Sequence, residues 1–250
     1  MWRAAALAVG LWASAAAAAD MPACRTGTFE DVPFTACEAD PKAGGLRLWH
    51  KDAGGALIGS FARLEDILAA RAERAVFAMN GAMYHPDRDP VGLYIESGKT
   101  LSPIALRAGP GNFGLLPNGV FCLSGGAATI TESRTFAASG QACDYAMQSG
   151  PLLVSGGALH PEILPNSRSA FIRNGIGVRP DGTVLAVIAD APVNFHRFAR
   201  LLRDHLGAPD ALFVDGNTSR LYAPGLGRSD IGFQMGPILA LAVPRDATAN

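Results

Sequence analysis

The sequence predicts an α+β fold in a single domain, with mixed, largely antiparallel β-sheets and a few packing helices. Glycine (29) and proline (17) are abundant, which indicates many turns between short strands. Apolar runs of strand length outnumber helical patterns, so repeated β–α–β winding is not expected. Charged residues make up 17% and apolar residues 49% of the chain, the balance of a globular protein rather than of a disordered one.

The first nineteen residues are typical of an export signal. Arg3 precedes residues 4–19, an unbroken stretch of apolar and small side chains that ends in three alanines before Asp20. A membrane anchor is the alternative, but this Ala-rich stretch is shorter than the roughly 20 strongly apolar residues that span a bilayer. We therefore expect a cleaved signal peptide at 1–19, a domain over 20–250, a periplasmic or secreted location, and no stable membrane span after cleavage.

Export changes the interpretation of the four cysteines. Cys24, Cys37, Cys122 and Cys143 form an even set, and an oxidising compartment favours disulfides. No CxxC pair is present, and the spacings do not match a zinc site. Of the three possible connectivities we favour the two local pairs, Cys24–Cys37 and Cys122–Cys143. The other pairings and buried free thiols remain the alternatives.

In the first half of the domain, one helix is expected among several strands. Leu64, Ile67, Leu68 and Arg71 follow helical spacing within residues 61–74, and Ser60 can cap that helix. Gly54-Gly55, Ser97-Gly98 and Pro117-Asn118-Gly119 are turn signals between paired strands. The strands expected here are residues 46–50, 56–59, 75–79, 91–95, 100–104, 112–116 and 120–123.

In the second half, the clearest turn and the strongest helix occur. The sequence Arg-Pro-Asp-Gly at 179–182 pre-sets a turn, since proline restricts φ and glycine accepts positive φ. Asn194 can cap a helix whose apolar stripe runs from Phe195 to Leu206 and which Gly207 ends. The strands expected here are residues 145–154 (broken at 150–151), 175–178, 183–188, 211–214 and 237–243.

Polar residues stand at four places where an apolar strand meets a glycine turn. These are Asn80, Gln148, the pair Arg173 and Asn174, and Asp215. A rigid strand holds such a side chain in place, and glycine lets a ligand approach the backbone closely. A turn-forming or capping role is the alternative for each one.

Several function classes lack support in the sequence. The chain has 21 Lys+Arg against 22 Asp+Glu, which excludes a generic basic nucleic-acid binder. No GxSxG, HExxH or Walker A motif is present, and no cofactor or metal is predicted. His85 with Asp87 and Asp89 could bind a cation, but we favour a solvated loop there.

Four motifs in a fixed order carry a family resemblance. Residues 80–84 read Asn-Gly-Ala-Met-Tyr, 148–152 Gln-Ser-Gly-Pro-Leu, 172–178 Ile-Arg-Asn-Gly-Ile-Gly-Val, and 213–219 Phe-Val-Asp-Gly-Asn-Thr-Ser. Over residues 46–243 the chain resembles the phosphodiester glycosidase family. That family often has Asn-Gly-Gly-Phe-Phe at the first motif and Asp-Gly-Gly-Gly-Ser at the last, so the identity of the substrate is not carried over.

The resemblance implies an exported enzyme that cleaves a sugar C1–O bond whose leaving group is a phosphate. Such a leaving group needs charge neutralisation more than protonation, and Arg173 suits that task. Asp215 is the candidate for stabilising the oxocarbenium-like centre or activating water, with Glu162 and Asp190 as the next carboxylates.

Asn80 and Gln148 are expected to bind sugar hydroxyls or phosphate oxygens of this small-molecule or glycan substrate. The other expected substrate-binding residues are Gly81, Gly150, Asn174, Gly175, Gly216, Asn217 and Ser219. A non-catalytic periplasmic protein that binds a glycan or a sugar phosphate is the alternative.

Overall fold

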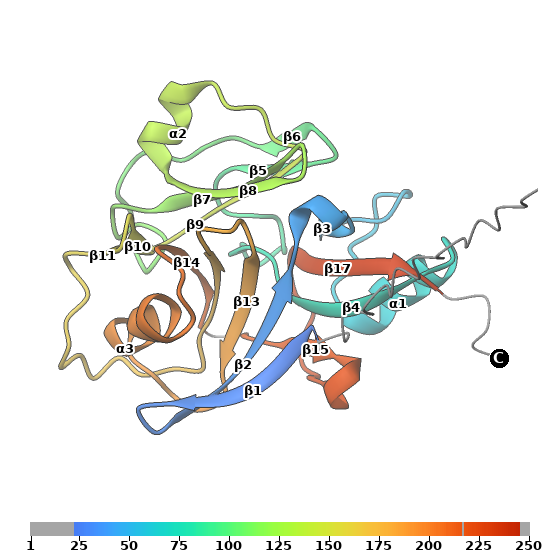
Figure 1. Cartoon of the computed structure of the whole chain (residues 1–250). Helices are drawn as coiled ribbons and strands as arrows, with labels where there is room; N and C mark the ends of the chain where they lie inside the picture. The colour runs from blue at the N-terminus through green and yellow to red at the C-terminus, as the bar shows by residue number, and fades with distance from the viewer. Residues whose placement is uncertain (1–22, 217, 246–250) are drawn as a thin grey trace, which may run out of the picture.

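The computed structural model describes residues 23–216 and 218–245, which form three antiparallel sheets (Figure 1). The expected signal segment 1–19 and the candidate Asn217 lie outside the described residues. The seven-stranded sheet has the order β1 (Cys24–Phe29), β2 (Val32–Ala39), β13 (Val184–Ala189), β12 (Asn174–Val178), β14 (Asp210–Asp215), β10 (Leu152–Ser155), β11 (Ala158–Leu159).

The other two sheets have five strands each. The β4 sheet has the order β16 (Arg228–Ser229), β15 (Leu221–Ala223), β4 (Glu73–Asn80), β17 (Ile238–Pro244), β3 (Leu46–Trp49). The β9 sheet has the order β6 (Lys99–Ser102), β5 (Tyr94–Glu96), β9 (Tyr145–Ser149), β7 (Gly119–Ser124), β8 (Ala127–Glu132). This architecture confirms the predicted α+β class with largely antiparallel sheets.

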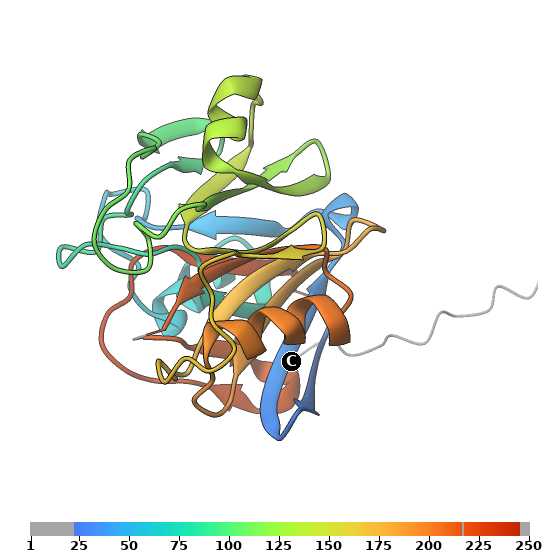
Figure 2. The ribbon, with the colours of Figure 1, turned by 90° about the vertical axis from the view of Figure 1, so that its left-hand side faces the viewer.

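Each sheet turns one face to a shared core and the other to a helix. The shared core joins apolar side chains of all three sheets, among them Phe77, Phe121 and Leu212. On the outer faces, α1 (Phe61–Ala69) covers the β4 sheet and α2 (Ser133–Ser139) covers the β9 sheet. The helix α3 (Phe195–Arg200) continues as a π-helical turn (Leu201–His205) and lies across the seven-stranded sheet (Figure 2).

Most local predictions are confirmed, and the helix boundaries show where they were wrong. Ser60 and Asn194 cap α1 and α3 as expected. The helix α1 ends at Ala69 rather than at residue 74, because the chain turns at Ala72, which has a φ of 55°, and enters β4. The strand β8, which pairs with β7 in a hairpin, and the short helix α2 that follows it were not predicted.

The strands and their pairing differ from expectation at three places. Residues 112–116 form no strand, and β7 pairs with β8 and β9 instead. Residues 56–59 contribute only an isolated bridge, Lys51 with Leu57, because β17 takes the position beside β3. The predicted strand 145–154 is two strands in two different sheets, since Pro151, which lacks an N–H, separates β9 from β10.

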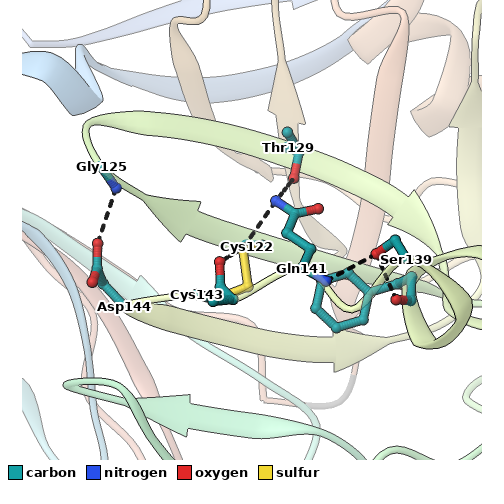
Figure 3. The surroundings of a disulfide bond; sticks show 9 residues. Cys122, Gly125, Thr129, Ser139, Gln141, Cys143 and Asp144 are labelled. Carbon is teal, nitrogen blue, oxygen red and sulfur yellow. Dashed lines mark hydrogen bonds between the residues drawn. A yellow bond between two sulfur atoms is a disulfide. The ribbon is translucent and has the colours of Figure 1, made fainter.

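The four cysteines form the two local disulfides that the sequence favoured. Cys24–Cys37 joins directly opposed residues of β1 and β2. Cys122–Cys143 ties β7 to the segment that follows α2 (Figure 3). Near it, the Asp144 carboxylate accepts a hydrogen bond of 3.0 Å from the Gly125 backbone N–H.

One connection between sheets creates the setting for a site. The chain leaves the seven-stranded sheet at the end of β14 and enters the β4 sheet at β15, so Gly216 and residues 218–220 lie between the two sheets. β15 pairs with β4 near Asn80, and β12 pairs with β14 so that Asn174 is opposite Asp215. Three of the four predicted polar junctions therefore meet here. Among the described residues, no helix is long and apolar enough to cross a membrane.

Candidate functional site

A cleft of about 790 Å³ opens beside the connection between β14 and β15. Five segments of the chain form its walls, through Met83, Tyr84, His85, Pro86, Arg88, Val91, Pro110, Gly111, Asn112, Phe113, Ser169, Phe171, Arg173, Phe213, Asp215, Gly216, Thr218, Phe233 and Gln234. This volume is that of a small-molecule site, about 300–1,000 Å³ in most proteins. Arg173 and Asp215 both line the cleft, so the structure brings the two predicted catalytic residues into one cavity.

Asp215 is the one carboxylate among the described residues that line the cleft. The buried strand β14 ends on it, and its side chain is held by Asn80 of β4 and by Thr218 in the connection between β14 and β15. Asn80 Nδ2 donates to Oδ2 at 3.3 Å, Thr218 Oγ1 donates to the same oxygen at 2.5 Å, and the Thr218 backbone N–H donates to Oδ1 at 3.2 Å. These contacts orient the carboxylate before any ligand arrives.

Arg173 is a buried cation surrounded by aromatic rings. Its side chain is 1% exposed, and its Cζ lies 3.6 Å from the ring centroid of Phe195 and 5.4 Å from those of Phe171 and Phe213. Nε donates to the Val193 carbonyl at 2.8 Å, and Nη2 donates to the Ser169 carbonyl at 2.9 Å.

The third guanidinium nitrogen, Nη1 of Arg173, is buried and has no hydrogen-bond partner among the described residues. The hydrogen bonds of Arg173 thus go to neutral groups and none of them to a carboxylate. Burial away from water lowers the pKa of Arg173 from its ordinary value to about 10, so the side chain is still a cation at neutral pH. An anion at this wall of the cleft would supply the missing partner and offset the desolvation of the charge.

Asn80 and Asn174 lie behind Asp215 and are not part of the cleft wall. Asn80 Oδ1 accepts from Asn174 Nδ2 at 3.2 Å and from the Arg220 backbone N–H at 2.7 Å. Asn80 Nδ2 donates to the Thr218 carbonyl at 2.8 Å as well as to Asp215. Both ends of the Asn80 amide are therefore engaged with the protein, which makes it a positioning residue in this geometry.

Gln148 lies in a separate buried network, in the β9 sheet. Its Oε1 accepts from the backbone N–H groups of Leu93 and Ala105 at 3.0 and 2.9 Å. Its Nε2 donates to the Ala105 carbonyl at 2.6 Å and to Asn118 Oδ1 at 3.3 Å. These contacts anchor the loop that carries residues 110–113 into the cleft wall. The structure thus places Gln148 behind a wall of the cleft rather than in it.

The candidate glycines divide into packing positions and one cleft position. An added Cβ would lie 2.5 Å from a backbone atom of β17 at Gly81, 2.8 Å from a backbone atom of β14 at Gly175, and 2.8 Å from the Phe113 carbonyl at Gly150. Their small size is needed for close packing of the chain. Only Gly216 of these four lines the cleft, with Arg173 Nη1 3.6 Å from the place of its missing Cβ.

Ser219 makes backbone contacts beside the site. Its Oγ lies 2.9 Å from both the Ile172 and the Asp215 carbonyl oxygens and can donate to one of them at a time. This contact ties the connection after β14 to the segment that leads into β12.

Sequence reasoning missed the hydroxyl groups and aromatic rings of the site. Tyr84 and Thr218 line the cleft, and their hydroxyl oxygens are 2.7 Å apart. Both residues lie inside the quoted motifs, at positions where the family often has Phe or Gly, and that difference was the available signal. The rings of Phe171 and Phe213 gave no polar signal, yet they line the cleft around Arg173.

The other carboxylates singled out in the sequence lie outside the cleft wall. Asp190 pairs with Arg228 at 2.6 Å and accepts from Thr35 Oγ1 at 2.8 Å, and Glu162 is exposed. Asp89 pairs with Lys51 at 2.7 Å in the expected surface loop. The described residues contain no group of three or more His, Cys, Asp or Glu side chains placed to hold a metal ion.

Comparison with known proteins relates the chain to one family and one fold. The family model described as phosphodiester glycosidase matches residues 73–233. The uncharacterized protein YigE of Escherichia coli (strain K12) is 33% identical over 187 residues, which are 74% of this chain and 72% of that protein.

Solved structures share the fold at low sequence identity. The catalytic domain of zebrafish N-acetylglucosamine-1-phosphodiester alpha-N-acetylglucosaminidase, auto-inhibited by its pro-peptide, matches with a TM-score of 0.60 and 12% identity, over 89% of this chain and 84% of that one. A putative exported protein from Burkholderia pseudomallei K96243 matches with a TM-score of 0.52 and 13% identity, over 84% of this chain and 74% of that one.

Proposed function

Because the chain belongs to the phosphodiester glycosidase family, we propose that it is an exported hydrolase that breaks the C1–O bond of a sugar-1-phosphodiester. The observation that carries this proposal is Arg173, a buried cation in the cleft wall with one guanidinium nitrogen unpartnered among the described residues. A phosphodiester supplies the anion that this arrangement accommodates. The name of the zebrafish enzyme, N-acetylglucosamine-1-phosphodiester alpha-N-acetylglucosaminidase, refers to a substrate of the same class.

In the proposed reaction, the electron pair of the C1–O bond leaves with the phosphate oxygen, and water adds its hydroxyl to C1. The products are a reducing sugar and a phosphomonoester. Arg173 neutralises the charge that develops on the leaving phosphate, so no acid is required to protonate it. Asp215 faces the positive charge that develops at C1, or accepts a proton from the attacking water.

The surroundings of Arg173 and of Asp215 each favour the role proposed for that residue. Phe171, Phe195 and Phe213 keep water from the guanidinium, and a charge–charge contact is stronger in such surroundings than in water. The hydrogen bonds from Asn80 and Thr218 hold Asp215 in one orientation, which reduces the rearrangement needed during the reaction.

The test is a panel of sugar-1-phosphodiesters assayed for released reducing sugar, with the reaction repeated in ¹⁸O-labelled water. We expect ¹⁸O in the sugar and none in the phosphomonoester, since the C1–O bond breaks. Label in the phosphate would show P–O cleavage and refute the proposed reaction. The variant Arg173→Met should lose turnover, while Arg197→Met, which removes a half-exposed arginine on α3, should retain it.

The alternative function is that of a non-catalytic protein that binds a sugar phosphate, and the same parent and variant proteins distinguish it. It predicts binding of a sugar 1-phosphate in calorimetry, abolished by Arg173→Met, with no reducing sugar released from any member of the panel.

A further inference from the structure

Two hydroxyl groups, those of Tyr84 and Thr218, meet in the wall of the cleft. The two residues are 134 positions apart in the sequence, yet their oxygen atoms are 2.7 Å apart and both residues line the cleft. Thr218 also contacts Asp215, so the three side chains form one hydrogen-bonded group.

The direction of the hydrogen bonds in this group follows from counting protons. Thr218 Oγ1 lies 2.5 Å from Asp215 Oδ2, and an ionised carboxylate can only accept. The single hydroxyl proton of Thr218 is therefore used on Asp215. The contact between Tyr84 and Thr218 must then be donated by the phenol, which leaves the oxygen of Tyr84 as a hydrogen-bond acceptor with no proton to offer.

The position of the phenol oxygen is also well defined. The ring of Tyr84 packs against Gly236, where an added Cβ would lie 2.6 Å from the ring, and the Arg88 guanidinium lies 5.3 Å from the ring centroid. The two hydrogen bonds hold the phenol oxygen within about 5 Å of Asp215 Oδ2. If Asp215 faces C1, an acceptor at that range is within reach of a substituent on C2.

We infer that Tyr84 selects substrates with a hydrogen-bond donor on C2, by accepting that bond on the phenol oxygen fixed by Thr218 and Asp215. This inference rests on the proposed function, because it needs C1 of a sugar beside Asp215. A hydrogen bond to a group on C2 strengthens as charge develops at the ring, so the effect appears in turnover as well as in binding.

The test is a cycle of two enzymes and two substrates. A sugar-1-phosphodiester from the panel and its 2-deoxy analogue are assayed with the parent protein and with Tyr84→Phe. We expect Tyr84→Phe to lower kcat/KM about tenfold for the 2-hydroxy substrate, the scale of one lost hydrogen bond, and to leave the 2-deoxy substrate within about twofold. Comparing the two enzymes cancels the different intrinsic reactivity of the two sugars.

Tyr145→Phe is the matched control. Its phenol lies outside the cleft, 3.4 Å from Ser97 Oγ, so its removal should change neither rate. Thr218→Val keeps the shape but removes the hydroxyl that holds Tyr84 to Asp215, and it should lower kcat/KM for both substrates, because Asp215 itself loses a contact.

An equal loss on both substrates in Tyr84→Phe would overturn the inference, because Tyr84 would then only position Asp215. If the parent protein turns over neither substrate, the proposed hydrolysis fails, and the same cycle is measured as binding of a sugar 1-phosphate and its 2-deoxy form. In that case, binding that depends on the C2 substituent only when Tyr84 is present supports the inferred selectivity. Binding that does not depend on the C2 substituent, or no binding at all, rejects the inference.

Discussion

Replacing Arg173 with methionine should remove anion binding while leaving the stability of the ligand-free protein nearly unchanged. Methionine is unbranched, can follow the path of the aliphatic stem of arginine, and is compatible with the rings of Phe171, Phe195 and Phe213 that enclose the site. Substitutions of large buried side chains usually destabilise a protein strongly, so a near-neutral result here is a specific expectation.

The magnitude follows from two opposing contributions. Burial lowers the pKa of Arg173 from its ordinary value to about 10, and that difference corresponds to a penalty of about 3 kcal/mol for holding the cation in the folded state. The folded pKa lies below the unfolded one, so the penalty is complete at every pH below about 10 and fades only as the pH rises above that value towards the pKa of the unfolded chain.

The opposing contribution is the loss of the bonds to Val193 and Ser169. These two carbonyl acceptors are worth about 3 kcal/mol together. Neither carbonyl is left without a hydrogen-bond partner by the change, because the Val193 carbonyl also accepts from the Phe171 N–H and Ser169 is exposed to water. We therefore expect the free energy of unfolding to change by no more than about 1 kcal/mol. Arg173→Lys should be less stable than Arg173→Met, because it keeps a buried charge and loses the planar fork.

The assay is thermal unfolding at pH 7 with and without inorganic phosphate at matched ionic strength. Phosphate at 100 times its Kd stabilises a protein that binds it by about 2.7 kcal/mol, which raises the Tm of a chain of this size by several degrees. Arg173→Met should show only the small general effect of phosphate on folded proteins. A loss above about 3 kcal/mol without phosphate, or an undiminished shift with it, would refute the reasoning.

Further predictions follow from the same contacts. Asp215→Asn should fold normally and lose turnover at least about 100-fold, while Asp66→Asn, an exposed carboxylate on α1, should match the parent protein in Tm and initial rate. Gln148→Met should lower the free energy of unfolding by about 3 kcal/mol or more in urea titration, since buried backbone groups lose their partner; an unchanged midpoint would contradict this. Burial lowers the pKa of His50 below 6.5, so the unfolded chain binds more protons and stability should fall as the pH drops through 6.5; His50→Gln should flatten that slope between pH 7.5 and 5.5. Exported protein should begin at Asp20 in intact-mass measurements and should react with a thiol reagent only after reduction of its two disulfides.

Short-range features of this fold were predictable because neighbouring residues determine them. The turn at residues 179–182 set the register of β12 against β13, and Ser60 and Asn194 began the two main helices. The local disulfide pairs belong to the same class, since their partners are 13 and 21 residues apart. In each case, backbone preferences and short loops leave few alternatives.

Pairings between distant strands were not predictable. β3 pairs with β17 rather than with the segment that follows it, and β1 and β2 complete the edge of the seven-stranded sheet. Apolar alternation shows that a strand has a buried face, but it does not say which strand lies beside it. That choice depends on how the three sheets share one core.

The sequence by itself determined the kind of chemistry to look for, because the order of its motifs, with Arg173 and Asp215 at the ends of apolar strands, is a property of the chain. Only the tertiary structure decided which residues meet. It placed Gln148 behind the cleft wall and brought Tyr84 to Thr218, a contact across 134 residues. The physical reason is that the packing of the sheets against one another determines which side chains are buried and which hydrogen bonds they make. A residue's neighbours along the chain do not determine that packing.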